Sequence, residues 1–170
     1  MGDWWRHVSD AVAHDLAHLG NGAEFAQVLV RLLAAGIFGA VLGYQRERMH
    51  QAAGLRTHIL VTMGAALFVL IIHFPAGNDA DLSRVIQGVV TGIGFLGAGA
   101  IIKLEPEKEV HGLTTAAGIW LATAIGMAAG VGRLDLALPG TILAFFVLSV
   151  LRKIEGDSHH AAGPPKGKEG

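Results

Sequence analysis

Cysteine is absent from this 170-residue chain, and charged residues are scarce. Without cysteine, the chain cannot form disulfides, bind iron–sulfur clusters or carry out thiolate chemistry. Only 16% of the residues are charged and the formal net charge is −1, which argues against a nucleic-acid-binding protein. The sequence also lacks the G-x-x-x-x-G-K-[ST] loop of P-loop ATPases and shows no nucleophile–base pairing. We therefore expect a protein that is not an enzyme.

Long apolar runs dominate what is present. Hydrophobic residues make up 52% of the chain, and the mean hydropathy is +0.49. Five runs are each near the ~17–25 residues that a helix needs to cross a bilayer: 27–44, 57–74, 85–102, 113–131 and 134–151. A soluble domain of this size has no interior large enough for five helices that are apolar on every face. The sequence predicts an all-α integral membrane protein with five transmembrane helices.

One motif offers a competing interpretation. Residues 92–97 match the G-x-G-x-x-G pattern of dinucleotide-binding turns. That turn requires a strand before it, a helix after it and an acidic residue about 20 positions further on. Here the glycines lie inside an uninterrupted apolar run, and residues 116–118 contain no acid. The pattern favours a membrane helix, in which glycine permits close helix approach.

The two ends of the chain differ from the apolar middle. Residues 1–22 carry apolar side chains at helical spacing with Trp4 near the start, which predicts a short interfacial amphipathic helix rather than a signal peptide. Residues 23–155 form the predicted membrane domain. Residues 156–170 have no large apolar side chain and are expected to be a disordered tail. His14 and His18 are four residues apart and form a weak candidate metal pair without a defined third ligand.

The loops between the spans carry an asymmetric charge. Seven basic residues lie on the side of the chain that contains the first–second loop, and three lie on the other side. By the positive-inside rule this places the N-terminus outside and the C-terminus in the cytoplasm. An odd number of spans requires the two termini to lie on opposite sides, in agreement with this arrangement.

Small residues recur at helical spacing within the spans. Such residues let helix backbones approach closely in lipid, where apolar burial contributes little. Both internal packing and a homodimer interface are compatible with the pattern, and internal packing is favoured. The predicted packing glycines are Gly39, Gly43, Gly88, Gly92, Gly94, Gly97, Gly118 and Gly126.

Polar residues within the spans are the candidate functional residues, and no acidic residue is embedded among them, since Asp135 lies at the very end of its run. Proton-coupled pumps and divalent-cation carriers usually place carboxylates at the bilayer midplane, so the absence of embedded carboxylates argues against that class. Arg31 either snorkels to the outer surface or has a role inside the bundle. Thr114 and Thr115 are interpreted mainly as helix-capping residues. The intramembrane polar set is Arg31, Gln87, Thr91, Thr114 and Thr115.

Three ordered blocks resemble the MgtC/SapB family of bacterial membrane proteins. The first is LGYQRER at residues 42–48 followed by AGLRTH at 53–58. The second is RVIQGVVTGIGFLGAGAII at 84–102, and the third is GLTTAAGIW at 112–120. The resemblance spans roughly residues 31–155 and implies a five-span hydrophobic domain in the bacterial cytoplasmic membrane.

The resemblance also implies a function. Family members are linked to growth in low magnesium and to survival inside macrophages, and one is described as an inhibitor of the F-type ATP synthase. Many members carry an ACT-like domain after the fifth span, and in this sequence only the tail follows. From the resemblance we expect a regulator of another membrane complex, with the F-type ATP synthase as the implied partner. We expect the protein to contact the lipid bilayer, and a homodimer is compatible with the small-residue pattern. The alternative is a small transporter or channel for Mg²⁺ or another ion, which a polar cavity around His58, Gln87 and Thr91 would favour.

Basic residues concentrate around the first cytoplasmic loop, more densely than orientation alone requires. Cations are favoured at the C-terminal end of the first span by the helix dipole and disfavoured at the start of the second. A partner must offset that cost for Arg56, and candidates are Glu47, a lipid phosphate or a carboxylate of another protein. The predicted functional surface consists of Arg46, Glu47, Arg48, Arg56, Thr57 and His58.

Overall fold

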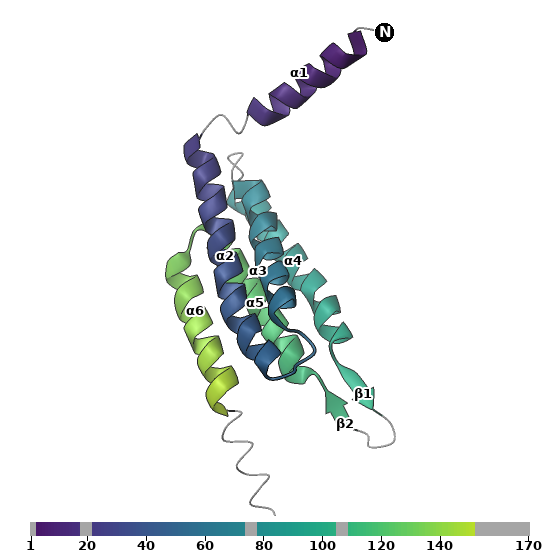
Figure 1. Cartoon of the computed structure of the whole chain (residues 1–170), viewed down its shortest axis with the longest axis vertical. Coiled ribbons are helices and arrows are strands. Elements are labelled where there is room, and N and C mark those ends of the chain that lie inside the picture. Colours follow the sequence, from purple (N-terminus) through teal and green to yellow (C-terminus); the bar gives the residue numbers. More distant parts are fainter. Residues whose placement is uncertain (1–2, 18–21, 74–77, 105–108, 152–170) are drawn as a thin grey trace, which may run out of the picture.

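Helices form most of the chain in the computed structural model, which describes residues 3–17, 22–73, 78–104 and 109–151 (Figure 1). In chain order the elements are α1 (Asp3–Ala17), α2 (Gly22–Arg48), α3 (Leu55–His73), α4 (Asp79–Gly99), β1 (Ile102–Leu104), β2 (Glu109–His111), α5 (Leu113–Val131), α6 (Leu134–Phe146) and a π-helical turn, η2 (Val147–Leu151).

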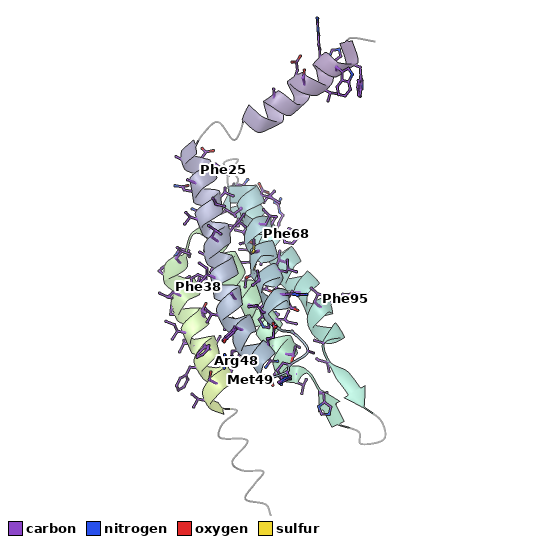
Figure 2. The ribbon with its side chains drawn as sticks, viewed as in Figure 1. Phe25, Phe38, Arg48, Met49, Phe68 and Phe95 are labelled. Atoms are coloured by element: carbon purple, nitrogen blue, oxygen red, sulfur yellow. The ribbon has the colours of Figure 1, made fainter. Side chains whose placement is uncertain are left out.

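Four of these helices, α2 to α5, are long and apolar enough to cross a bilayer. The fifth predicted span corresponds to α6 and its π-helical turn, an apolar segment that is shorter than the other four. The chain is therefore an all-α, multi-pass membrane protein. Its outward-facing side chains agree with contact with lipid, since Phe95 is 84% exposed and Leu60 is 70% exposed. Figure 2 shows Phe95 at the outer edge of α4, and Phe25 and Phe68 are likewise exposed.

The centre of the bundle is formed by α3 and α5. Helix α2 packs against both, α4 lies along their other side, and α6 contacts α5 and α2 (Figure 1). Half of the residues in the apolar stretch of α5 are buried, compared with 11% of those in the apolar stretch of α4. Core side chains are small, with Ala35, Ala66, Ala122 and Ala129 fully buried, so the helices approach closely.

Close backbone contacts occur at some of the predicted packing glycines. A Cβ at Gly126 would lie 2.7 Å from the Cα of Thr62, and one at Gly39 would lie 2.6 Å from the carbonyl oxygen of His58. A Cβ at Gly43 would lie 2.7 Å from the Cα of Leu55. These glycines let α2 and α5 press directly against the backbone of α3.

The glycines of α4 behave differently from the expectation of close packing. At Gly88, Gly92 and Gly94 a Cβ would meet no atom within 4 Å, so these residues touch no other described helix of the chain. Gly97 is intermediate, since its Cβ would lie 3.8 Å from that of Ala116. Helix α4 packs on the bundle through other residues, of which Ile93 and Gly97 are buried, and Gly88, Gly92 and Gly94 are exposed.

A short antiparallel hairpin connects α4 to α5, and the sequence analysis did not anticipate it. Ile102 pairs with His111 and Leu104 with Glu109. Gly112 then turns the chain into α5 with φ of +91°, a conformation that side chains with a Cβ rarely adopt.

The N-terminal helix α1 lies apart from the bundle in Figure 1, and its Trp4 and Trp5 are 59% and 65% exposed. Its interfacial location remains a prediction. His18 and the predicted tail lie outside the described residues, and the side chain of His14 is likewise not described.

Candidate functional site

Polar side chains are buried together at the end of the bundle where α2 ends and where α3 and α5 begin. Gln45 and Arg46 come from the last turns of α2, His58 from the first turn of α3 and Thr115 from the first turn of α5. Their exposed fractions are 7%, 3%, 1% and 2%, respectively. Four helical residues with polar groups at this depth require internal partners, because water does not reach them. We call these four residues the buried polar cluster.

The helical pattern of α2 explains why Arg46 is buried. Gly39, Leu42 and Arg46 follow one another at three- and four-residue spacing and therefore share one face of the helix. That face packs on α3, since Gly39 touches the backbone of His58 and Leu42 is 1% exposed. Arg46 lies on the same packing face and is therefore buried, whereas Arg48, two residues further on, lies on another face and is exposed.

Arg46 joins α2 to the start of α5. Its Nη2 donates a short hydrogen bond to Oγ1 of Thr115, and it also donates to Oε1 of Gln51 at 3.3 Å. Hydrogen bonds from a buried guanidinium are stronger than neutral ones, and they cost more to lose. The sequence analysis interpreted Thr115 mainly as a cap, whereas here it is the acceptor for a buried cation.

His58 has one ring nitrogen bonded and one without a partner. Its Nδ1 lies 3.0 Å from the carbonyl oxygen of Gly54, so Nδ1 carries the proton and donates. The neutral ring then presents Nε2 as an acceptor, and this atom is buried without a hydrogen-bond partner among the described residues. The Thr62 hydroxyl donates to the carbonyl oxygens of His58 and Ile59, each 3.0 Å away.

Gln45 connects α2 to the last turn of the described chain. Its Nε2 donates to Oγ of Ser149, and the carbonyl oxygen of Phe145 lies 3.5 Å away. Its Oε1 is buried without a partner among the described residues. Gln45 was not among the predicted site residues. The signal that could have identified it was its position beside Leu42 and Arg46 on the packing face of α2.

The predicted functional surface is divided between interior and exterior. Arg46 and His58 belong to the buried polar cluster, and Thr57 is half-buried. Glu47, Arg48 and Arg56 are exposed at the same end of the bundle. Glu47 accepts a hydrogen bond of 2.8 Å from the backbone N–H of Leu55 and so caps the start of α3. Arg48 lies over the ring of Tyr44, with 4.8 Å between its Cζ and the ring centroid.

The other predicted polar residues are dispersed. Arg31 is half-buried and donates to the carbonyl oxygen of Gly130 at 3.1 Å, so it caps the C-terminal end of α5. Gln87 and Thr91 are exposed on α4, where Thr91 donates to the carbonyl oxygen of Gln87 at 2.8 Å. The structure therefore does not place Gln87 and Thr91 in a cavity with His58. Thr114 is exposed and lies at the edge of a pocket.

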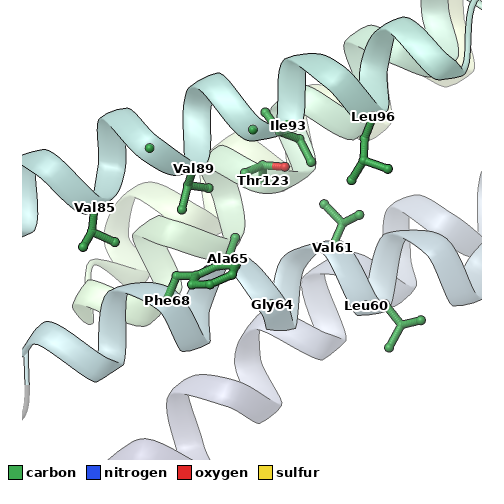
Figure 3. A pocket seen from close by; sticks show the side chains of 12 residues that line it. Leu60, Val61, Gly64, Ala65, Phe68, Val85, Val89, Ile93, Leu96 and Thr123 are labelled. Atoms are coloured by element: carbon green, nitrogen blue, oxygen red, sulfur yellow. The ribbon is translucent and has the colours of Figure 1, made fainter.

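Two apolar pockets lie between helices of the described bundle. The larger is a groove of about 630 Å³ between α3 and α4, lined by Phe68, Val85, Val89 and Leu96, with Thr123 as its one polar side chain (Figure 3). Gly88 and Gly92 form part of the α4 wall. The smaller is a pocket of about 330 Å³ between α5 and α6, which His58 closes from α3.

The charge of the described interior is neutral to positive. Its buried polar side chains are those of glutamine, arginine, histidine and threonine, and no Asp or Glu is among them. No group of three or more His, Asp or Glu side chains with the geometry to hold a metal ion occurs among the described residues. The arrangement can stabilise the fold and accept or donate hydrogen bonds, and it offers a divalent cation no anionic oxygen ligand.

Comparison with known proteins places these features in a family. A family model described as "MgtC family" matches residues 32–156. The protein SrpB of Synechococcus elongatus is 42% identical over 74% of this chain and 75% of its own length. A protein of Escherichia coli K12 described as "Putative magnesium transporter YhiD" is 38% identical over 76% of this chain and 62% of its own length. The protein MgtC of Brucella abortus is 40% identical over 72% of this chain and half of its own length. No solved structure matches the chain.

Proposed function

Because the chain belongs to the MgtC family, we propose that it is a non-enzymatic regulator that acts by contact with another membrane complex. In this way it would serve magnesium or membrane-energy homeostasis in a bacterial cytoplasmic membrane. Magnesium enters the proposal because the relative YhiD is described as a putative magnesium transporter and because of the family resemblance. The F-type ATP synthase, which the same resemblance implies, is the first partner to test, and a second copy of the chain is the next.

The chemistry of the buried polar side chains favours regulation over transport of Mg²⁺. Mg²⁺ prefers oxygen ligands, chiefly carboxylates, and gives up its water shell reluctantly. The described interior has no buried carboxylate and contains the cation of Arg46, which repels a divalent cation in a low-dielectric environment. A permeation path for Mg²⁺ through this interior would therefore be unfavourable.

The open face of α4 supports action by contact. Gly88 and Gly92 have no neighbouring atom within 4 Å of a Cβ position, and they lie along the groove between α3 and α4. In lipid, small residues on an exposed helix face allow another transmembrane helix to approach closely. The groove is therefore the surface on which we expect the partner helix to pack.

The end of the bundle that carries the buried polar cluster is proposed to face the cytoplasm. The exposed cations Arg48 and Arg56 lie there, in agreement with the positive-inside rule. Arg56 remains the predicted contact residue for a carboxylate or phosphate on the partner, because a guanidinium can bind either one bidentately.

Filling the groove tests the proposed contact. Gly92→Leu adds a side chain to the α4 wall of the groove, where a Cβ has no neighbouring atom within 4 Å, so the leucine should fit in the groove and membrane level and stability should be retained. We expect this variant to lose complementation of low-magnesium growth in a bacterium that lacks its own family member. Gly94→Leu is the matched control, since Gly94 is equally open but is not part of the groove wall. Full complementation by Gly92→Leu, at wild-type protein level, would remove the groove as the contact surface.

A further inference from the structure

The smaller pocket combines apolar walls with a buried acceptor on His58, and the exposed Thr114 is its other polar side chain. Leu42, Leu121, Leu143 and Leu148 form much of its wall, and His58 lies on it from α3. Its volume of about 330 Å³ is within the range of small-molecule sites. The described wall residues Leu121 and Leu143 are 37% and 64% exposed, so the pocket opens towards the lipid-facing side of α5 and α6.

The acceptor is Nε2 of His58. The ring is 1% exposed, its Nδ1 proton is committed to the carbonyl oxygen of Gly54, and Nε2 has no hydrogen-bond partner among the described residues. A buried acceptor without a partner is unfavourable, so a donor that reaches it recovers part of that cost. The ring therefore selects for a hydrogen-bond donor.

Gly118 leaves the space from which a donor can approach. His58 Nε2 is the one heavy atom near the position of a Cβ at Gly118, and it lies 3.7 Å away. An oxygen atom in that space needs to move less than about 1 Å further to reach hydrogen-bond distance. Gly118 itself is part of the pocket wall, so the space is continuous with the apolar volume.

We propose that this pocket binds an uncharged, lipid-soluble molecule with a hydroxyl group. The hydroxyl donates its hydrogen bond to Nε2 of His58, and the chain lies against the leucines of α5 and α6. Carboxylates and phosphate diesters are ionised at neutral pH and have no proton to donate to an acceptor. An ammonium group could donate, but placing its charge in an apolar pocket is unfavourable. A hydroxyl satisfies both constraints, and the ligand enters from the bilayer.

Photolabelling in nanodiscs tests this proposal. The full chain is reconstituted in dioleoylphosphatidylcholine, a lipid without hydroxyl or amine donors, and exposed to hexadecanol that carries a diazirine in its chain. We expect saturable labelling of peptides from α5 and α6. The methyl ether of the same probe cannot donate a hydrogen bond and should bind roughly 3- to 10-fold more weakly.

Gly118→Ala provides a variant that blocks the approach without disturbing the fold. The added methyl group would be in ordinary contact with His58 at 3.7 Å, and alanine favours a helix more than glycine does. Labelling by the alcohol should fall to the level of the ether. Gly97→Ala, whose methyl group would be 3.8 Å from that of Ala116 and outside this pocket, should label as the wild type does. Equal labelling by alcohol and ether, or unchanged labelling of Gly118→Ala, would show that the pocket holds only nonspecific lipid or water and would overturn the proposal.

Discussion

Helices α4 and α5 carry similar glycine patterns and use them in different ways. In α5, Gly126 and Gly130 touch the backbone of α3, where a Cβ at Gly130 would lie 2.6 Å from the carbonyl oxygen of Ala66. In α4, Gly88 and Gly92 face open space along the groove. Glycine spacing thus identifies helix faces that permit close approach, and it does not identify which of those faces is occupied within the chain. The α5 face stabilises the fold, and the α4 face is available for a partner.

Adding one methyl group to the α5 face should have the largest effect. Gly126→Ala places a Cβ 2.7 Å from the Cα of Thr62, and backbone atoms cannot rotate away as a side chain can. We expect the free energy of unfolding to fall by about 3 kcal/mol, the upper part of the range for overpacking. Titration of the purified protein from mild detergent into a denaturing one measures this change. Wild-type stability would mean that α3 and α5 are further apart than described.

The polar contact at the start of α5 should have the next largest effect. Thr115→Val removes the acceptor for Nη2 of Arg46 and leaves a buried guanidinium N–H without that bond. The expected loss of stability is about 1–2 kcal/mol. Thr114→Val is the matched control, because Thr114 is adjacent in sequence but exposed, and it should be near neutral. Equal effects of the two substitutions would contradict the assignment of Thr115 as the partner of Arg46.

The contact at the other end of α5 should contribute less. Arg31→Met keeps most of the side-chain length but removes the hydrogen bond to the carbonyl oxygen of Gly130. We expect a loss of about 1 kcal/mol, because water can replace part of this half-buried bond. Arg84→Met, which removes an exposed ion pair with Asp81 on α4, should change stability by less. A larger loss of stability for Arg84→Met than for Arg31→Met would contradict the view that contacts with α5 stabilise the fold more than surface contacts on α4.

The smallest effect is expected on the open face of α4, and its sign should be opposite. Gly92→Ala meets no atom within 4 Å and replaces a poor helix former by a good one. Stability should therefore stay the same or rise by up to about 1 kcal/mol. The same titration applied to Gly126→Ala and Gly92→Ala gives the contrast directly. A marked loss at Gly92 in the isolated protein would indicate that this face is already packed, for instance in a dimer.

The sequence was sufficient for the membrane class and for most helix positions because long apolar runs have few other stable structures. It was less informative about burial. Arg46 and Arg48 are two residues apart, yet one lies inside the bundle and the other outside, and only the face shared with Gly39 and Leu42 separates them. The hairpin of β1 and β2 was missed because each strand has only three residues, too few to show an alternating pattern.

The site was predicted in part for a related reason. The prediction of one functional surface rested on the density of charged residues around the loop. Hydrogen bonds instead determine where each of these side chains lies. Glu47 caps α3 through the N–H of Leu55, and Arg46 reaches Thr115, which is 69 residues further along the chain. Contacts between residues so distant in sequence depend on how α2, α3 and α5 pack, which a single sequence does not reveal.

Magnesium flux through the purified protein tests most directly the claim that the chain acts by contact. The full chain is reconstituted in liposomes that contain a fluorescent Mg²⁺ indicator, with a magnesium ionophore as the positive control. The account predicts that influx equals that of protein-free liposomes, even for protein that restores low-magnesium growth in cells. Influx above that background, saturating with external Mg²⁺ and proportional to the amount of protein, would contradict it and establish transport.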